Sequence, residues 1–317
     1  MKIVIPGGSG QVGQILTRWS AAHGHEVVIL SRGAATSGWR TVEWDGRTLG
    51  PWRREIDGAD VVINLTGRSV NCRYTPNNRH AIMASRVEST RVVGEAVAAA
   101  ERPPAVWLQA STATIYAHRF DAANDEATGI LGGNEPDAPP RWRFSIDVAR
   151  AWENELERAV TPQTRRVALR TSLVMSPDRG GIFDVLLGLV RLGLGGTVGS
   201  GRQYVSWIHG RDFARAIEWL ITHNQIAGRV NVTAPEPLPY ATFMSTLRAA
   251  WGAPFGLPAT RWMLRVGTLL MRTESELVLK SRRVVPARLL ESGFTFEFPT
   301  WPPAAADLCR EVRASRR

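Results

Sequence analysis

Cysteine is scarce in this 317-residue sequence: only Cys72 and Cys309 occur, far apart and without the spacing of a metal site. We therefore expect no disulfide framework, and a reducing cytoplasm is the simplest setting. Uninterrupted hydrophobic runs are short, and none reaches the roughly 20 residues that a membrane-spanning helix needs. The opening residues MKIVIPGG indicate a strand that enters a glycine loop rather than a secretory signal. The six histidines are dispersed, so we predict no metal site. The short hydrophobic runs likewise predict no membrane association.

Lysine is almost absent too, since Lys2 and Lys280 are the only two in the chain. The formal net charge of +10 therefore comes almost entirely from arginines, which are scattered along the sequence. A nucleic-acid footprint would gather basic residues locally, with aromatic residues between them. We expect a solvated basic surface and no nucleic-acid partner.

The first half of the chain alternates strand-like and helical stretches, which is typical of a parallel sheet covered by helices. We predict an α/β fold: a Rossmann-type doubly wound parallel sheet over residues 1–176, then a smaller C-terminal substrate lobe over 177–317. Helix and strand contributions from 205–233 can return to the sheet, and a C-terminal extension begins near residue 250. The expected strands are 2–5, 26–30, 41–43, 61–65, 106–110 and 167–170, with short strands near 228–233. The expected helices are 11–22, 81–100, 150–159, 240–251 and 261–271, and residues 121–143 form a long loop of the kind that is often functional.

A glycine-rich loop gives the clearest local signal for a ligand. The segment Gly7-Gly8-Ser9-Gly10-Gln11-Val12-Gly13 follows the first strand directly and precedes an amphipathic helix. Missing side chains let backbone N–H groups and the helix dipole face a pyrophosphate, whereas a purely structural turn would need no such context. We predict that Gly7, Ser9, Gly10, Gln11, Val12 and Gly13 contact a dinucleotide.

The end of the second strand bears on which dinucleotide binds. An NAD-selective site places an acidic residue here to bind both ribose hydroxyls, but this sequence has Ser31 and Arg32 instead. A hydroxyl and an arginine fork suit a 2′-phosphate, although a solvent-facing arginine is the alternative interpretation. We therefore predict NADP(H) in preference to NAD(H).

The glycine spacing GxxGxxG resembles that of the extended short-chain dehydrogenases/reductases, with Pro6 in place of their usual threonine. Asn64-Leu65-Thr66-Gly67 is similar to their NLAG strand end, and residues 111–116, STATIY, are similar to the SSATVYG strand end of sugar-nucleotide epimerases. Segments 85–90, 152–153, 199–212 and 285–294 resemble the epimerase-like atypical subgroup, which has a small C-terminal domain.

This resemblance implies further site residues and a substrate class. It places Leu65, Thr66, Gly67, Arg86, Ala110 and Ser111 beside the cofactor, although Arg86 could instead only pair locally. It implies that Arg202 and Gln203 contact a substrate diphosphate, with a surface turn as the alternative. The substrate would be a small molecule, either a nucleotide sugar or a carbonyl compound. The sequence leaves the oligomeric state open.

The catalytic pair of the superfamily, Tyr-x-x-x-Lys on a helix, is missing. In that pair the lysine lowers the tyrosine pKa so that the phenol can transfer a proton near neutrality. Lys2 lies in the first strand and Lys280 in the C-terminal region, so their sequence positions predict that neither takes the role. Ser145 and Ala149 align with the missing pair. The residues four positions after Tyr74, Tyr116, Tyr204 and Tyr240 are Asn78, Phe120, Ile208 and Met244.

Three other residues are candidates for proton transfer: Thr112, which matches the hydroxyl that polarises a substrate carbonyl, Tyr116 and His209. The alternatives are a packed strand-end tyrosine and a structural histidine at a strand–helix junction. Two functions follow: an NADP(H)-dependent oxidoreductase or epimerase-like enzyme that works without the pair, or a non-catalytic NADP(H) sensor or regulator. In a sensor, apolar side chains such as Trp142, Phe144 or Trp207 would close the substrate pocket.

Overall fold

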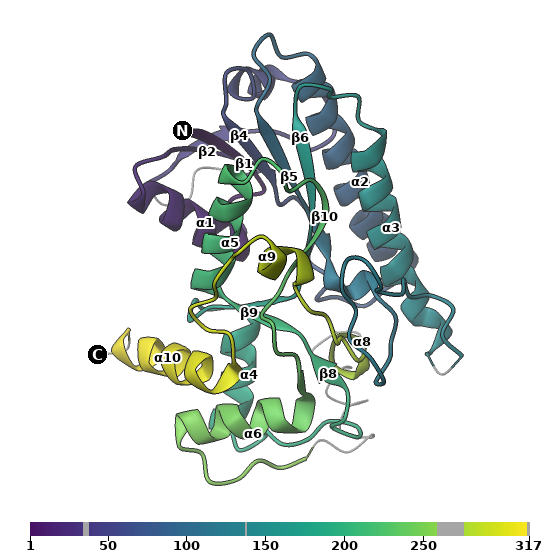
Figure 1. Ribbon diagram of the computed structural model, residues 1–317, viewed down its shortest axis with the longest axis vertical. Coiled ribbons are helices and arrows are strands. Elements are labelled where there is room, and N and C mark those ends of the chain that lie inside the picture. The colour runs from purple at the N-terminus through teal and green to yellow at the C-terminus, as the bar shows by residue number, and fades with distance from the viewer. Residues whose placement is uncertain (34–37, 137, 259–275, 316–317) are drawn as a thin grey trace.

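The computed structural model describes residues 1–33, 38–136, 138–258 and 276–315 (Figure 1). Its centre is a seven-stranded sheet in the order β10-β6-β5-β4-β1-β2-β3, in which every neighbouring pair is parallel. The strands are β1 (Lys2–Pro6), β2 (Glu26–Ser31), β3 (Arg40–Glu43), β4 (Val61–Asn64), β5 (Val106–Thr112), β6 (Arg165–Thr171) and β10 (Gly228–Val232).

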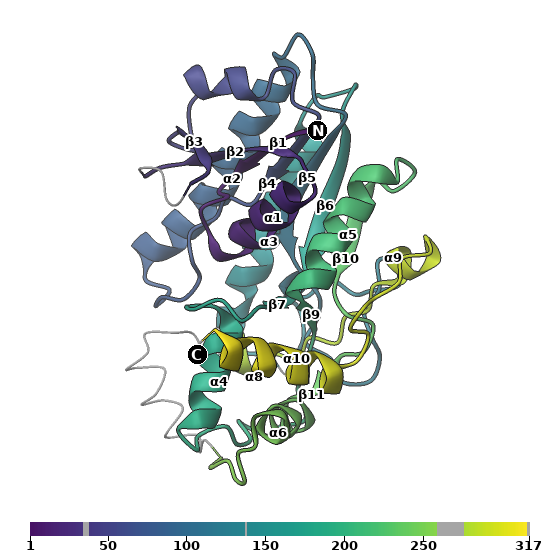
Figure 2. The same ribbon diagram turned by 90° about the vertical axis from the view of Figure 1, so that its left-hand side faces the viewer.

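Helices cover both faces of this sheet (Figures 1 and 2). One face carries α1 (Gln11–Ala22) and α5 (Gly210–Thr222), and the other carries α2 (Pro76–Ala98) and α3 (Arg143–Arg158). Successive strand residues point to opposite faces of the sheet. Ile3 and Ile5 of β1 therefore belong to the hydrophobic cluster under α1 and α5, while Val4 belongs to the cluster under α2 and α3. Coverage on both sides explains why the strands read as nearly continuous hydrophobic runs.

A second lobe surrounds its own apolar core below the sheet. Its helices are α4 (Ile182–Arg191), α6 (Tyr240–Trp251) and α10 (Trp301–Ala314), whose buried residues include Phe183, Phe243 and Trp301. Two small sheets complete it, a parallel pair of β7 (Leu173–Met175) with β9 (Trp207–His209) and an antiparallel pair of β8 (Tyr204–Val205) with β11 (Leu238–Pro239). Short helices are η1 (Pro51–Glu55), η2 (Ala113–Ile115), η3 (Pro140–Trp142), α8 (Glu276–Leu279) and α9 (Ala287–Glu291).

The predicted α/β class is confirmed, and helices α1 and α6 have the predicted bounds. Two other helices begin earlier than the hydrophobic pattern indicated. Helix α2 begins at Pro76 because the Thr75 hydroxyl caps it and accepts a hydrogen bond from the Asn78 N–H, and α3 begins at Arg143 because η3 runs straight into it. The predicted helix over 261–271 lies outside the described residues.

Residues 121–143 form few regular elements and lie along the C-terminal segment. The Asn124 N–H donates to the Arg283 carbonyl (2.7 Å), and the Val285 N–H donates to the Asn124 carbonyl (3.0 Å). This pairing brings residues 280–285 beside the carboxyl end of β5. Among the described helices, none combines the length and the apolar character needed to cross a membrane.

Candidate dinucleotide site and its surroundings

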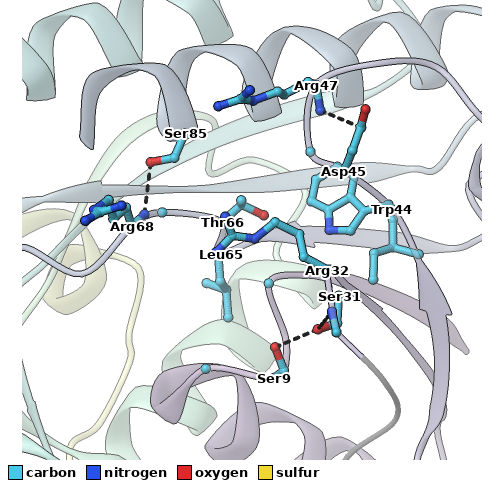
Figure 3. Close-up of a pocket in the computed structure, with 16 residues that line it drawn as sticks. Ser9, Ser31, Arg32, Trp44, Asp45, Arg47, Leu65, Thr66, Arg68 and Ser85 are labelled. Carbon is cyan, nitrogen blue, oxygen red and sulfur yellow. Dashed lines mark hydrogen bonds between the residues drawn. The ribbon is translucent and has the colours of Figure 1, made fainter. Parts of the chain in front are cut away.

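A cavity of about 330 Å³ opens at the carboxyl ends of β1, β2, β3 and β4 (Figure 3). Ligands of open α/β sheets bind at this edge because the loops on either side of the point where the strand order reverses, here β4 and β1, run to opposite faces and leave a crevice. The lining residues are Gly7, Ser9, Gly10, Leu30, Ser31, Arg32, Gly33, Trp44, Asp45, Gly46, Arg47, Leu65, Thr66, Gly67, Arg68 and Ser85.

The glycine loop fits this cavity only because side chains are missing. Gly7 has a φ of 77°, and a Cβ there would lie 2.9 Å from the Thr66 Cα. A Cβ on Gly13 would lie 2.5 Å from the Gly8 Cα, so α1 is packed directly against the loop. No side chain caps α1 at Gly10, and its first turn carries no acidic residue. The unsatisfied N–H groups of this turn are therefore suited to an anion such as a pyrophosphate.

The end of β2 supplies a hydroxyl and a cation. The Ser31 Oγ lies 3.1 Å from the Ser9 Oγ, which joins the strand end to the glycine loop. Figure 3 shows the exposed Arg32 side chain extending from β2 toward Leu65 and Thr66. Within the described part of the chain no acidic group pairs with Arg32, whereas Arg47 is ion-paired with Glu88 at 2.8 Å. Arg32 is thus a cation of the cavity wall that is available to an incoming phosphate, and Arg68, which donates to the Asn78 Oδ1, likewise has no acidic partner among the described residues.

Asp45 is the one carboxylate in the cavity wall, and neighbouring groups already occupy its oxygens. It accepts hydrogen bonds from the Arg47 N–H (2.8 Å), the Thr48 N–H (3.0 Å) and the Thr48 hydroxyl (2.6 Å). The Thr48 hydroxyl, followed by these N–H groups, lowers the pKa of Asp45. The carboxylate therefore holds the turn after β3, and three arginines leave the cavity positively charged.

The structure gathers eight of the predicted cofactor residues in the cavity wall: Gly7, Ser9, Gly10, Ser31, Arg32, Leu65, Thr66 and Gly67. Gln11, Val12 and Gly13 lie behind it in the first turn of α1, and the Gln11 Nε2 lies 3.5 Å from the Ser176 Oγ. Trp44, Asp45, Arg47, Arg68 and Ser85 also line the cavity, although no cofactor contact was predicted for them. The turn WDGR directly after the third strand was the available signal, since the carboxyl ends of adjacent parallel strands share one edge.

Arg86 lies beneath the cavity rather than in its wall. Its Nη1 donates to the carbonyls of Arg68 (3.1 Å) and Ile82 (3.0 Å), and its guanidinium stacks over Trp152 at 5.0 Å. Burial lowers the pKa of Arg86 to about 10. A Cβ on Gly67 would lie 3.1 Å from the Arg86 Cζ. Arg86 therefore supports the backbone after β4, and its contact with a cofactor stays a prediction.

Beyond the cavity, β5 leads into a buried polar network. The Ser111 hydroxyl donates to the Glu153 Oε1 (2.6 Å), and Arg170 donates to both oxygens of Glu153 (2.8 and 2.7 Å). The Tyr116 hydroxyl accepts from Arg170 (2.9 Å) and donates to the Asn231 Oδ1 (2.9 Å), and burial raises the pKa of Tyr116. Tyr116 is 2% exposed, so the structure gives its phenol a packing role. Ala110 precedes Ser111 on the same strand.

His209 is equally enclosed, at the N-terminus of α5. Its Nδ1 accepts from the Arg211 N–H (3.1 Å), its Nε2 lies 3.3 Å from the Asp307 Oδ2, and its ring stacks on Phe298. Burial, followed by Arg211, lowers the pKa of His209 to about 4, so the ring is neutral at pH 7. The Asp307 Oδ2 also accepts a hydrogen bond from Arg211, and the Asp307 Oδ1 accepts one from Arg310. His209, Asp307 and Glu311 lie close enough together to share a metal ion, but Asp307 is ion-paired with both arginines.

The remaining predicted residues lie at two different places. Thr112 ends β5, and its Oγ1 accepts from the Thr114 N–H (3.1 Å). Arg202 is exposed, while Gln203 is buried and donates to the carbonyls of Val198 (2.9 Å) and Val278 (3.4 Å). Gln203 therefore fixes the neighbouring turn, and a substrate contact by either residue stays a prediction.

The sequence position of Lys280 was a misleading guide. The ammonium of Lys280 donates to the Thr114 carbonyl at 2.8 Å, two residues beyond Thr112. Its place late in the sequence therefore does not keep Lys280 away from the end of β5, while the expectation that it does not serve as the lysine of a Tyr-x-x-x-Lys pair stays a prediction. The C-terminal segment returns to the end of β5 through its pairing with Asn124, and no local pattern in the sequence reveals that return.

Comparisons with known proteins agree with this architecture. The model of the NAD-dependent epimerase/dehydratase family matches residues 3–233, and that of a domain of unknown function, DUF1731, matches residues 259–308. The epimerase family protein YfhF of Bacillus subtilis is 32% identical over 301 residues, which span 94% of either chain. The crystal structure of human epimerase family protein SDR39U1 (isoform 2) with NADPH superposes with a TM-score of 0.83 at 28% identity, covering 98% of this chain and 99% of that one. UDP-N-acetylglucosamine 4-epimerase from Bacillus cereus shares the fold, with a TM-score of 0.76 at 14% identity over 99% of each chain.

Proposed function

Because this chain belongs to the NAD-dependent epimerase/dehydratase family, we propose that it binds NADP(H) and acts as an oxidoreductase or epimerase-like enzyme on a small molecule, without a Tyr-x-x-x-Lys pair. When bound, the nicotinamide supplies hydride chemistry. The observation that carries the proposal is the cavity at the strand ends. It combines an uncapped helix N-terminus with Ser31 and an arginine, Arg32, that has no acidic partner within the described residues.

The residues present fit two parts of such a cofactor, the pyrophosphate and the 2′-phosphate. The loop from Gly7 to Gly10 leaves room for backbone contact with a pyrophosphate, and the Leu65–Gly67 backbone closes the opposite side. Ser31 and Arg32 suit a ribose 2′-phosphate, since an arginine presents two parallel N–H donors to phosphate oxygens. The human relative of similar length was crystallised with NADPH, which supports the same choice here.

The substrate class is a carbonyl compound or a nucleotide sugar, and we place its site on the side of the second lobe. Family membership and the shared fold of a UDP-sugar epimerase support this class. A reducing cytoplasmic setting accords with the two cysteines, Cys72 and Cys309, which are both free.

A second candidate is a non-catalytic NADP(H) sensor. The enclosure of the Tyr116 hydroxyl favours it, because that phenol has no access to a substrate. Of the residues expected to plug a sensor's pocket, Trp142 lines a second cavity, while the other two lie elsewhere. Trp207 is packed in the core of the second lobe, while Phe144 stacks edge-on against Tyr74 at 5.1 Å.

Calorimetric titration of cofactor-free protein with NADPH and with NADH tests the proposal. We expect tighter binding of NADPH, and Arg32→Ala should weaken it by about 10–100-fold, the worth of one charge-assisted hydrogen bond or two, while changing NADH binding less than about 3-fold. Arg54→Ala is the matched control, because Arg54 is exposed on η1 and lies outside the cavity wall. Equal losses for both cofactors would refute the 2′-phosphate assignment, and no binding of either would refute the proposed function.

A further inference from the structure

A second cavity, of about 290 Å³, lies beside the end of β5 and is not explained by dinucleotide binding. Residues 133–136 and 138–140, the start of α3 and Lys280 line it. Its wall includes the apolar side chains of Trp142 and Ile146 and the charged side chains of Glu135 and Lys280. A pocket with an apolar wall and a few polar groups is the ordinary form of a small-molecule site.

Lys280 is the group in this wall that can donate and recover a proton near neutrality. Its side chain is only 1% exposed, yet its ammonium has one hydrogen-bond acceptor among the described residues, the Thr114 carbonyl at 2.8 Å. Glu276 is its ion-pair partner at 3.8 Å. An ammonium carries three N–H donors, so it can serve a ligand in the cavity while keeping both contacts.

The neighbours of Lys280 hold it in place from several elements. The Ser145 hydroxyl on α3 donates to the Glu276 Oε2 at 2.6 Å, and the Arg282 Nε lies 3.1 Å from the Thr114 Oγ1. Glu135 accepts hydrogen bonds from the backbone N–H groups of His118 (2.7 Å) and Gly133 (2.6 Å). The Ser281 N–H, directly after Lys280, donates to the His118 Nδ1 (2.8 Å). The lysine is thus held by the Thr114 carbonyl and by Glu276, and Glu135 adds a second negative charge to the same cavity wall.

Two residues connect this cluster with the end of β5 and with the supports of the dinucleotide cavity: Thr114, which accepts from Lys280, and Tyr74. Ser145 occupies the position that aligns with the tyrosine of the missing catalytic pair, and Thr114 closely follows the strand end at Thr112. Burial lowers the pKa of Arg86 and of Arg282. Tyr74 partly offsets the shift for Arg86, and Glu276 followed by Tyr74 partly offsets it for Arg282, so Tyr74 lies near both guanidinium groups. Arg86 supports the wall of one cavity and Arg282 the lysine of the other.

We propose that Lys280, positioned by Glu276 and Ser145, is the proton donor and acceptor of this protein, and that a carbonyl-bearing substrate occupies the 290 Å³ cavity beside it. The inference rests on the proposed function. In the reducing direction the carbonyl carbon receives a hydride from the reduced nicotinamide cofactor, and the C=O π pair moves to the oxygen. The oxygen takes a proton from the Lys280 ammonium, which leaves an alcohol, the oxidised cofactor and a neutral amine that solvent reprotonates.

The electrostatics of the cluster suit this role. Burial and then Arg282 lower the pKa of Lys280 to about 8, while Glu276 and Glu135 raise it. Both protonation states are therefore populated near physiological pH, which an effective acid–base group requires. The surrounding arginines stay charged over this range, so Lys280 is the cation of the cluster that can exchange a proton.

The scarcity of lysine makes a direct test possible, because incorporation of ¹³Cε-lysine labels only two side chains. Lys280→Arg identifies the Lys280 signal by its loss, and Lys2→Arg is the matched control that removes the other signal. We expect the Lys280 signal to titrate near pH 8 rather than near the ordinary value of about 10.4. Glu276→Gln should lower that midpoint further, because it removes a neighbouring negative charge.

The decisive comparison uses two complexes of the same protein, with NADP⁺ and with NADPH. These ligands differ at the ring by one positive charge, so a nearby Lys280 should titrate at least about 0.4 pH units lower with NADP⁺. Equal midpoints in two saturated complexes would overturn the inference and leave the proposed function standing. Absence of binding by calorimetry would remove both.

Variants then connect the titration to turnover. Lys280→Met and Lys280→Arg should each reduce any NADPH-dependent carbonyl reduction by at least about 100-fold, since the first has no proton to give and the second cannot deprotonate. Lys2→Arg should keep full turnover. Should Lys280→Met fail to fold, the arginine variant and the titration of the unaltered protein still decide the question. Full activity in a folded Lys280→Arg protein would overturn the assignment.

Discussion

Gly13→Ala tests the packing of the glycine loop against α1, where two opposing effects can be compared. Gly13 lies in the first turn of the helix and has an ordinary negative φ. On propensity alone, alanine in a helix would stabilise the protein by about 0.5–1 kcal/mol relative to glycine. The added Cβ, however, would lie 2.5 Å from both the Cα and the carbonyl oxygen of Gly8.

The contact decides the sign of the effect. Carbon atoms pack at about 3.5–4.0 Å, so a separation of 2.5 Å forces the loop or the helix to move by roughly 1 Å. Both contacting atoms belong to the backbone, which cannot rotate away as a flexible side chain would. Overpacking of this kind typically costs about 1–3 kcal/mol, which outweighs the gain in propensity. We expect a net loss of about 1–2 kcal/mol in the free energy of unfolding.

Urea denaturation followed by tryptophan fluorescence measures this loss. Gly188→Ala is the matched control, because Gly188 also lies within a helix, α4, and a Cβ there would meet nothing within 4 Å. The control should gain about 0.5–1 kcal/mol. If Gly13→Ala proves as stable as Gly188→Ala, then the packing of α1 on the loop is not what restricts this position to glycine.

Three further substitutions test the buried polar groups. Glu153→Ala should lower the free energy of unfolding by about 3–5 kcal/mol, because it leaves the Arg170 charge unpaired and buried. Glu157 is exposed, so Glu157→Ala should lower it by under about 1 kcal/mol, and similar losses for both variants would contradict this account. Tyr116→Phe should lower the free energy of unfolding by about 1–2 kcal/mol and leave NADPH affinity unchanged in calorimetry, since both contacts of its hydroxyl are internal; a lost affinity instead would give the phenol a role at the cofactor. His209 has a pKa of about 4 when folded and about 6.5 when unfolded, so the unfolded state binds the proton first and stability falls as the pH drops from 6.5 to 4, by up to about 3 kcal/mol. His209→Asn keeps an acceptor for the Arg211 N–H. Its free energy of unfolding in urea titrations should therefore rise relative to that of the unaltered protein when the pH is lowered from 7.5 to 4.5. A difference in stability that stays constant over this range would show that His209 is not the titrating group.

Local signals in the sequence were sufficient for the central sheet and for most of the glycine loop. Strand β1 and helix α1 are adjacent in sequence, and the glycines between them are required by contacts within a few residues, such as that between Gly13 and Gly8. The same holds for the strand end at Ser31 and Arg32, which directly follows a hydrophobic run. Where a few neighbouring residues determine the local structure, the sequence pattern is sufficient to predict it.

The contacts around Lys280 could not be predicted from the sequence, for a physical reason. Lys280 contacts Thr114 and Glu276, and Glu276 in turn contacts Ser145, so the arrangement joins three segments that are far apart in the sequence. No periodicity or motif marks Lys280 as a neighbour of β5. Arg47 is an intermediate case, because the rule that adjacent strand ends share an edge would have found it once the strand order was known.

Strand β10 has a consequence for how the protein is made. It forms one edge of the main sheet by pairing with β6, but it is translated only after all of residues 172–227. Throughout that interval the seven residues of β6 remain an open edge on the nascent chain, and such edges readily pair with other chains. A premature stop codon or a proteolytic cut before Gly228 would therefore yield an aggregating fragment rather than a smaller working domain.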